Sequence, residues 1–412
     1  MKYGLIGEKL GHSFSPAIHK ILGNNEYELT EIKKNKLDEF MQKKDFIGIN
    51  VTLPYKKDVL PYLSQISDKA KKIGCVNVVV KKEDGSLVGD NTDYDGVKYM
   101  LENTGIEVTG KKCLILGNGA TSLTVFAVLS DLGAKEIIKI YRKGEMNFEN
   151  VYSIADAQII VNTTPVGMYP ENEGSLIDLS RFPMLEGVAD VIYNPIKTNL
   201  ILQAERLGIK CSGGLKMLVA QAKYASDIFF NTRTDDSVID EIYQKIIFDI
   251  RNIAFVGMPG CGKSSIAKLV AEKMEKKFID TDSIIVDLEG REIPEIFAIY
   301  GEKYFRSVEI EACRIAGKRR ATVISLGGGA VTNRENIDAI RQNALVFYIK
   351  RDIDKLSRTD RPLSKDMDTL WNIYEERKDK YEQAADYIVY NNENIEACVD
   401  KVIELIYKGE SR

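Results

Sequence analysis

The sequence contains little of what several common kinds of functional site require. Its 412 residues include only two histidines, His12 and His19, so neither a histidine-based catalytic triad nor a histidine-rich metal site is expected. The six cysteines are scattered without a C-x-x-C pair, which favours a reducing compartment over a disulfide framework. No apolar run reaches about 18 residues, and Met1 leads almost directly into a strand-like segment. We therefore expect a soluble, cytoplasmic protein without a signal peptide or a membrane partner.

An excess of charge of one sign is also lacking. The 57 basic and 61 acidic residues leave a formal net charge of -4, which argues against a nucleic-acid-binding surface. With 44% hydrophobic residues, a chain of this length can bury sizeable cores and is expected to form two or three domains.

The clearest motif lies past the middle of the chain, where residues 257–264 fit G-x-x-x-x-G-K-[ST]. An apolar run at 253–256 predicts a buried strand before it, and 264–276 predicts a helix after it. The glycines allow consecutive N–H groups to wrap around a phosphate, Lys263 would reach the β- and γ-phosphates, and Ser264 would bind Mg²⁺. The alternative, an ordinary glycine-rich turn, does not account for the flanking strand and helix.

Two polar features in the first half indicate a small acidic substrate. Ser13 and Ser15 face the same way in an extended segment and could donate to one carboxylate, although they could instead cap a helix expected from about Ala17. Lys56 follows the proline that ends the strand predicted within 46–56, and the polar turn 89–96 offers a carboxylate partner. A partly desolvated lysine can transfer protons, whereas most lysines are simply solvated.

A dinucleotide-binding turn follows at Gly117-Asn118-Gly119. The predicted strand 111–116 precedes it and a predicted helix follows, although Ser122 replaces the third glycine of the usual pattern. The next strand, 136–140, ends at Arg142 and Lys143, and two cations there favour the 2′-phosphate of NADP over NAD. Further predicted strands at 157–162 and 187–193 are consistent with a parallel sheet.

Seven ordered blocks across roughly the first 250 residues resemble shikimate dehydrogenase. They are residues 11–16, 50–56, 74–77, 91–93, 162–168, 190–195 and 213–221. The family usually has G-x-G-G-A where this chain has Gly117 to Thr121, and Asn-Arg-Thr where it has Tyr141-Arg142-Lys143.

The resemblance implies a role for each matching residue. Lys56 and Asp93 become the catalytic pair, and Ser13 and Ser15 bind the substrate carboxylate. The remaining residues implied to contact the substrate, several of them at ring hydroxyls, are Thr52, Asn77, Tyr193, Gly214 and Gln221. Those implied to bind NADPH are Gly117, Gly119, Ala120, Arg142, Lys143 and Met217.

The second half begins after a predicted helix at 234–248. A short predicted strand at 277–282 ends in Asp280 and Asp282, of which one could assist Mg²⁺ and the other orient an acceptor hydroxyl. The alternative is a helix N-cap followed by solvated acids. Arg306 and Glu309 stand at i, i+3 and could pair on a helix, a second glycine-rich turn covers 326–330, and a helix is predicted at 369–384.

These blocks resemble shikimate kinase over residues 250–412. The resemblance implies that Asp282 acts on the acceptor hydroxyl, while Arg306, Gly328 and Arg377 hold the substrate. Arg361 becomes the arginine on the transferred phosphoryl group, Arg358 a candidate adenine contact, and Asp280 an indirect Mg²⁺ ligand. The residues implied to bind ATP, besides Arg361, are Gly260, Cys261, Gly262, Lys263, Ser264 and Ser265.

The whole chain therefore resembles a fusion of the two families, with an α/β fold throughout. Residues 1–249 are expected to form a dehydrogenase domain, with a substrate subdomain (1–100 and 220–249) and an NADP-binding Rossmann subdomain (101–219). Residues 250–412 are expected to form a P-loop kinase domain with a parallel sheet. The implied reactions are NADPH-dependent reduction of 3-dehydroshikimate and ATP-dependent phosphorylation of shikimate. The alternatives are a quinate/shikimate dehydrogenase that uses NAD, and a non-catalytic sensor of quinate metabolism.

Overall fold

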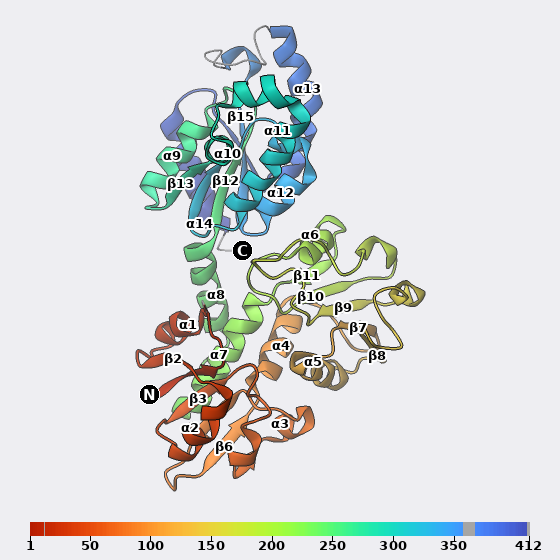
Figure 1. Ribbon diagram of the computed structural model, residues 1–412, viewed down its shortest axis with the longest axis vertical. Coiled ribbons are helices and arrows are strands. Elements are labelled where there is room, and N and C mark those ends of the chain that lie inside the picture. Colours follow the sequence, from red (N-terminus) through yellow and green to blue (C-terminus); the bar gives the residue numbers. More distant parts are fainter. Residues whose placement is uncertain (12, 357–366, 410–412) are drawn as a thin grey trace. The chain divides into compact units, whose positions relative to one another are not determined.

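The computed structural model describes residues 1–11, 13–356 and 367–409. The chain divides into two compact units, Met1–Tyr243 and Gln244–Arg412. The helix α8, Ser237–Ile250, runs across this division. Three sheets are present in the described residues, two in the first unit and one in the second (Figure 1).

The first sheet of the first unit is mixed, with the order β2-β1-β3-β5-β6-β4. Its strands are β1 (Tyr3–Gly7), β2 (Tyr27–Glu31), β3 (Gly48–Val51), β4 (Gln65–Ile66), β5 (Val78–Lys81) and β6 (Leu87–Asp90). Alternate residues bury opposite faces: Val79 packs in one hydrophobic cluster with Ile49, and Val78 packs in another with Phe229. Helices therefore cover both faces, and the strand ends are left to carry polar residues.

The second sheet is fully parallel, with the order β11-β10-β9-β7-β8. Its strands are β7 (Lys112–Leu116), β8 (Glu136–Ile140), β9 (Ile159–Asn162), β10 (Gly187–Asp190) and β11 (Lys210–Ser212). Cys113 and Ile115 belong to one buried cluster, and Leu114 and Leu116 to the other. An all-parallel sheet buried on both faces is the Rossmann arrangement, so the carboxyl ends of its strands are the expected ligand side.

The helices of the first unit connect and cover these sheets. They are α1 (Ser15–Ile21), α2 (Leu37–Lys43), α3 (Asp68–Ile73), α4 (Thr92–Asn103), α5 (Ala120–Asp131), α6 (Asn199–Arg206) and α7 (Leu215–Phe230). Helices α4 and α7 pack against each other so closely that a Cβ on Gly96 would lie 2.7 Å from the Met217 carbonyl oxygen. Glycine at position 96 therefore lets the helix that carries Asp93 approach the helix that carries Gln221.

The second unit contains one parallel sheet, with the order β13-β14-β12-β15-β16. Its strands are β12 (Asn252–Val256), β13 (Lys277–Asp280), β14 (Thr322–Ser325), β15 (Ala344–Lys350) and β16 (Tyr387–Tyr390). Its helices are α9 (Lys263–Lys273), α10 (Thr281–Glu289), α11 (Ile293–Gly317), α12 (Arg334–Arg341), α13 (Met367–Ala384) and α14 (Ile395–Gly409). Helices α9 and α14 lie on one face of the sheet, with α11 and α12 on the other (Figure 1).

The α/β fold class predicted from the sequence is confirmed, and two local predictions are corrected. Helix α1 begins at Ser15 rather than near Ala17. Its N-cap residue is Phe14, whose side chain forms no capping hydrogen bond with the described residues. The strand predicted to end at Asp282 ends at Asp280, because Asp280 is the N-cap of α10 and accepts a hydrogen bond from the Asp282 N–H at 3.0 Å. Asp282 therefore lies in the first turn of a helix.

Among the described helices, none is long and apolar enough to cross a membrane.

Candidate active sites

One cavity of about 200 Å³ in the first unit brings together residues that the sequence spreads over more than two hundred positions. The predicted residues that line it are Ser13, Ser15, Thr52, Lys56, Asn77, Asp93, Tyr193, Gly214, Met217 and Gln221. Asn50 and Thr121 also line it and were missed as site residues, although Asn50 begins one of the quoted blocks and Thr121 lies in the glycine turn.

Lys56 and Asp93 form an ion pair inside this cavity. Lys56 Nζ lies 2.5 Å from Asp93 Oδ2, and the two side chains are 14% and 12% exposed. The other carboxylate oxygen, Oδ1, accepts a hydrogen bond from Asn77 Nδ2 at 2.9 Å. The ammonium group is thus held by a carboxylate that is itself fixed, an arrangement able to deliver a proton to a substrate oxygen.

Ser13 and Ser15 lie together at the start of α1. The Ser13 hydroxyl lies 3.1 Å from the Ser15 hydroxyl, and Ser13 Oγ accepts the Ser15 N–H at 3.2 Å. Because both residues line the cavity, two hydroxyl groups are available to one anionic group of a ligand.

The glycine turn between β7 and α5 adopts a backbone that needs glycine. Gly117 has φ +119°, and a Cβ there would lie 2.6 Å from Thr163 Oγ1. Gly119 is the N-cap of α5, and a Cβ on it would meet no atom within 4 Å. Arg142 and Lys143 follow β8 and are exposed.

The second unit folds its motif into a strand, a loop and a helix, as predicted. Gly257, Gly260 and Gly262 all have positive φ, at 154°, 88° and 91°. Ser264, in the first turn of α9, donates to Asp280 Oδ2 at 3.1 Å and lies 2.9 Å from Ser325 Oγ. The Ser264 hydroxyl and the Asp280 carboxylate therefore lie together beside the start of α9. Asp280 accepts the hydrogen bond from Ser264 and also caps the N-terminus of α10.

Asp282 lies among charged groups. Burial and the charge of Asp280 raise the pKa of Asp282 to about 6, and Lys263 and Arg306 oppose that rise. A Cβ on Gly327 would lie 2.7 Å from Asp282 Oδ1, so the second glycine turn passes close to the carboxylate. The alternative of a solvated acid does not fit this position.

Two arginines lie against the same glycine turn. A Cβ on Gly329 would lie 2.4 Å from Arg306 Nη1, and Arg306 pairs with Glu309 at 3.0 Å on α11. Arg377 Nη1 donates to the Gly328 carbonyl oxygen at 3.2 Å, and the buried Arg377 Nε has no hydrogen-bond partner among the described residues. An anionic ligand would satisfy that donor.

Comparison with known proteins matches both units. The family model "Shikimate dehydrogenase substrate binding domain" matches residues 5–79, and "Shikimate kinase" matches residues 259–407. The NADP(+) shikimate dehydrogenase of Clostridium beijerinckii is 36% identical over 260 residues, covering 58% of this chain and 96% of the relative. That of Caldicellulosiruptor bescii is 38% identical, covering 56% and 89%. The chain belongs to the shikimate dehydrogenase family.

Solved structures agree with this assignment of the first unit. A chorismate mutase/shikimate 5-dehydrogenase fusion from Clostridium acetobutylicum is 36% identical with a TM-score of 0.56, covering 59% of this chain and 96% of that one. The shikimate 5-dehydrogenase of Thermus thermophilus, in complex with NADP(H) and shikimate, is 28% identical with a TM-score of 0.53 and covers 60% and 99%. The predicted fusion of a shikimate dehydrogenase with a shikimate kinase domain is confirmed.

The roles of the individual site residues stay predictions, and the structure places these residues in separate groups. The shikimate dehydrogenase cavity contains every residue predicted to contact its substrate, together with Met217. Gly117, Gly119 and Ala120 lie at the start of α5, and Arg142 and Lys143 follow the neighbouring strand. In the kinase domain Gly260 to Ser265 form the loop and first turn of α9. Arg361 and Arg358 lie outside the described residues.

Proposed function

We propose that the chain catalyses two consecutive reactions on one small molecule. The shikimate dehydrogenase unit reduces the C3 carbonyl of 3-dehydroshikimate with NADPH, and the shikimate kinase unit phosphorylates the resulting hydroxyl with ATP. The observation that carries the first reaction is the Lys56–Asp93 ion pair inside the cavity lined by the other predicted substrate contacts. We further propose the domain limits 1–249 and 250–412 for the two activities.

The residues around the glycine turn fit a dinucleotide. Gly119 caps α5 with room for a Cβ, so protein packing does not account for glycine there, whereas close approach of a pyrophosphate does. Arg142 and Lys143 are exposed cations at the carboxyl end of β8, suited to a 2′-phosphate. When bound, NADPH supplies a hydride to the substrate carbon.

The first unit's own residues hold the substrate and supply the proton. Ser13 and Ser15 bind the carboxylate, and Asn77 and Gln221, which line the same cavity, orient ring hydroxyls. Lys56 delivers its proton to the carbonyl oxygen as that oxygen gains negative charge. Asp93 holds the lysine in place through their ion pair.

The second unit's residues fit phosphoryl transfer with Mg²⁺. Ser264 and Asp280 supply a hydroxyl and a carboxylate, both oxygen donors of the kind that Mg²⁺ prefers. When bound, the ion neutralises charge on the transferred phosphoryl group. Lys263 contacts the phosphates, Asp282 orients the acceptor hydroxyl and accepts its proton, and Arg306 and Arg377 hold the substrate.

The raised pKa of Asp282 gives the kinase reaction a defined pH dependence. A carboxylate must be ionised to accept a proton, so kcat/KM for shikimate should fall to half at the pKa of about 6 and approach a plateau above it. At pH 5 we expect a loss of about tenfold relative to pH 7. Initial rates of ADP formation between pH 5 and 8 measure this, with 3-dehydroshikimate reduction by the same chain as the reference. A flat kinase profile would exclude Asp282 as the proton acceptor.

The remaining alternatives have less support. A non-catalytic sensor does not require an intact Lys56–Asp93 pair or the Ser264–Asp280 contact, and both are present. A quinate dehydrogenase that uses NAD does not explain two cations after β8, and the relatives named above are enzymes of the NADP(+) type.

One assay tests both activities. The purified chain is given 3-dehydroshikimate, NADPH, ATP and Mg²⁺, and NADPH loss and ADP formation are followed together. We expect NADPH loss first and ADP formation after it. If 3-dehydroshikimate causes no NADPH loss, the first half of the proposal is wrong, and if added shikimate causes no ADP formation, the second half is wrong.

Arg142 is expected to set the preference for NADPH. Because a charge-assisted contact to a phosphate is worth about 1.5–3 kcal/mol, Arg142→Ala should raise the KM for NADPH by about 10- to 100-fold and leave the KM for NADH nearly unchanged. The matched control is Lys135→Ala, which removes an exposed cation at the opposite end of the same strand. If Arg142→Ala raised the KM for NADPH and the KM for NADH equally, Arg142 would not bind the 2′-phosphate.

A further inference from the structure

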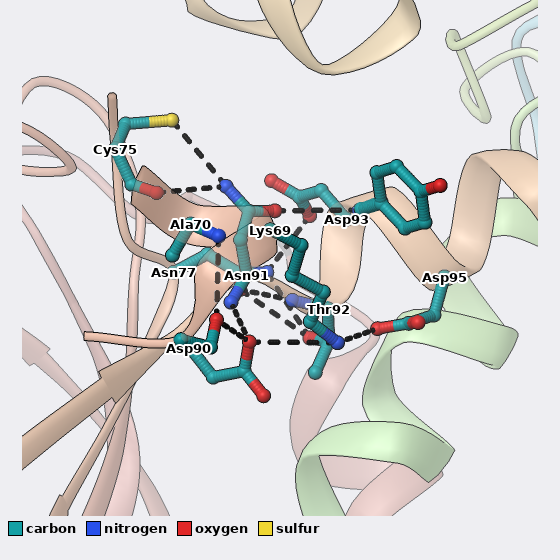
Figure 2. Close-up of polar contacts among 11 residues, drawn as sticks. Lys69, Ala70, Cys75, Asn77, Asp90, Asn91, Thr92, Asp93 and Asp95 are labelled. Atoms are coloured by element: carbon teal, nitrogen blue, oxygen red, sulfur yellow. Dashed lines mark hydrogen bonds and ion pairs between the residues drawn. The ribbon is translucent and has the colours of Figure 1, made fainter. Parts of the chain in front are cut away.

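A second lysine–carboxylate cluster lies beside the Lys56–Asp93 pair and is used by none of the steps above. Lys69, on α3, lies 2.5 Å from Asp95 Oδ2 and 3.4 Å from Asp90 Oδ1. Figure 2 shows its ammonium group between the two carboxylates, which come from the end of β6 and the first turns of α4. The side chains of Lys69, Asp95 and Asp90 are 27%, 26% and 22% exposed, so solvent screens them only in part. We call Lys69, Asp90 and Asp95 the Lys69 bridge.

The Lys69 bridge is hydrogen-bonded to the backbone just before Asp93. Asp90 Oδ1 accepts the Asn91 N–H at 2.7 Å and the Ser67 hydroxyl at 2.5 Å. Asn91 in turn caps α4 by accepting the Tyr94 N–H at 3.3 Å, and it donates to the Cys75 carbonyl oxygen at 3.0 Å (Figure 2). The bridge therefore holds both ends of the segment 90–95.

Asp93 lies inside that segment but faces another direction. Residues two apart on an α-helix are about 200° apart around its axis, so Asp95 and Asp93 leave α4 on opposite sides. Asp93 contacts Lys56 and Asn77 and lines the cavity, whereas none of the three bridge residues is among the described residues that line it. The contacts that connect Lys69 to Asp93 therefore run through the backbone of the segment 90–95.

Charge explains why Lys69 is needed at this place. Asp90, Asp93 and Asp95 put three carboxylates at the start of one helix, where Lys56 compensates Asp93 and Lys69 compensates the other two. Burial raises the pKa of Asp95, and the charge of Lys69 opposes that rise. Without Lys69, two partly buried carboxylates would repel each other across the segment that carries Asp93.

We propose that Lys69 is a positioning residue for the reduction of 3-dehydroshikimate, because its bridge to Asp90 and Asp95 fixes the helix start that presents Asp93 to Lys56. The proposal rests on the proposed dehydrogenase function. A displacement of a catalytic group by about 1 Å can cost about a hundredfold in rate, so a smaller shift of Asp93 is expected to lower kcat by about tenfold.

The test compares variants of the full-length chain. Lys69→Met should lower kcat for NADPH oxidation by about tenfold and change the KM for 3-dehydroshikimate by less than about twofold. Lys69→Arg, which keeps the charge, should restore kcat to within about threefold of the wild type. The control is Lys71→Met, which removes a lysine from the same helix whose partner, Asp68, is fully exposed. The rate of shikimate-dependent ADP formation by each variant measures the amount of intact chain, and the rate of NADPH oxidation is divided by it.

A second variant covers the case in which Lys69→Met does not fold. Asp95→Asn keeps the shape of the side chain and removes one charge of the bridge, and it should lower kcat by about three- to tenfold at constant KM. The double variant should lose less than the product of the two single losses, because both changes remove the same interaction.

Several results would overturn the proposal. If the wild type oxidises NADPH and Lys69→Met has the same kcat, or a higher KM with unchanged kcat, Lys69 does not position Asp93. An equal loss of kcat in Lys71→Met would show a general effect of lost charge. A wild-type chain without NADPH oxidation would instead overturn the proposed dehydrogenase function, and this inference with it.

Discussion

Lys56→Met is expected to lower kcat for 3-dehydroshikimate reduction by about 10³-fold and to leave shikimate-dependent ADP formation unchanged. Positioned general acids typically contribute about 10²- to 10⁴-fold, and Lys56 is the only lysine among the described residues that line the cavity. The variant also leaves Asp93, which is 12% exposed, without its cation, so unfolding must be measured alongside activity. NADPH oxidation at saturating substrate, normalised to the kinase activity of the same chain, gives the result.

The matched control for this experiment is Lys57→Met. Lys57 is the next residue, is exposed, and does not line the cavity. Its substitution should change kcat by less than about twofold. A Lys56→Met variant that retains a tenth or more of the wild-type kcat would show that another group supplies the proton.

Lys263→Met is expected to have the opposite selectivity. Removal of the lysine that we propose to contact the transferring phosphates should lower kcat for ADP formation by about 10²- to 10³-fold, because its charge would act where negative charge moves in the transition state. NADPH oxidation by the same chain should be unchanged. Steady-state rates with shikimate, ATP and Mg²⁺ measure the effect.

Lys268→Met provides the control for the kinase domain. Lys268 lies on the same helix, is exposed, and rests over the Phe278 ring at 5.5 Å. We expect a change in kinase kcat of less than about twofold. Equal losses in Lys263→Met and Lys268→Met would mean that the helix, rather than the lysine at its start, was disturbed.

The local motifs were predictable because each depends on a short backbone conformation. Gly257, Gly260 and Gly262 all have positive φ, and the residues on either side form the expected strand and helix. The same holds for Gly117 before α5. A backbone that must wrap around a phosphate restricts the residues that can form it, so these segments carry their signal in a few consecutive positions.

The exact partners of distant residues were predictable only where a family resemblance supplied them, because the turn 89–96 offers Lys56 three carboxylates. Nothing in the local sequence around Lys56 specifies Asp93 as its partner, yet the two lie 2.5 Å apart. Asp282 was predicted to end a strand, and it lies instead in the first turn of a helix that Asp280 caps. The boundary depended on whether the carboxylate of Asp280 would accept a backbone N–H, which sequence spacing leaves open.

The sequence by itself determined the parallel strands and the glycine turns, because these follow from periodicity and from consecutive residues. The two enzyme families followed from the resemblance of its ordered blocks to known families. Only the tertiary structure decided the environment of each charge. The Lys69 bridge joins α3 to the end of β6 and the start of α4, and the raised pKa of Asp282 depends on burial beside Asp280. The ion pairs of Lys69 and the pKa of Asp282 both depend on the side chains that surround the charged group and on how far water is excluded from it. Packing between segments that are far apart in the chain sets these surroundings.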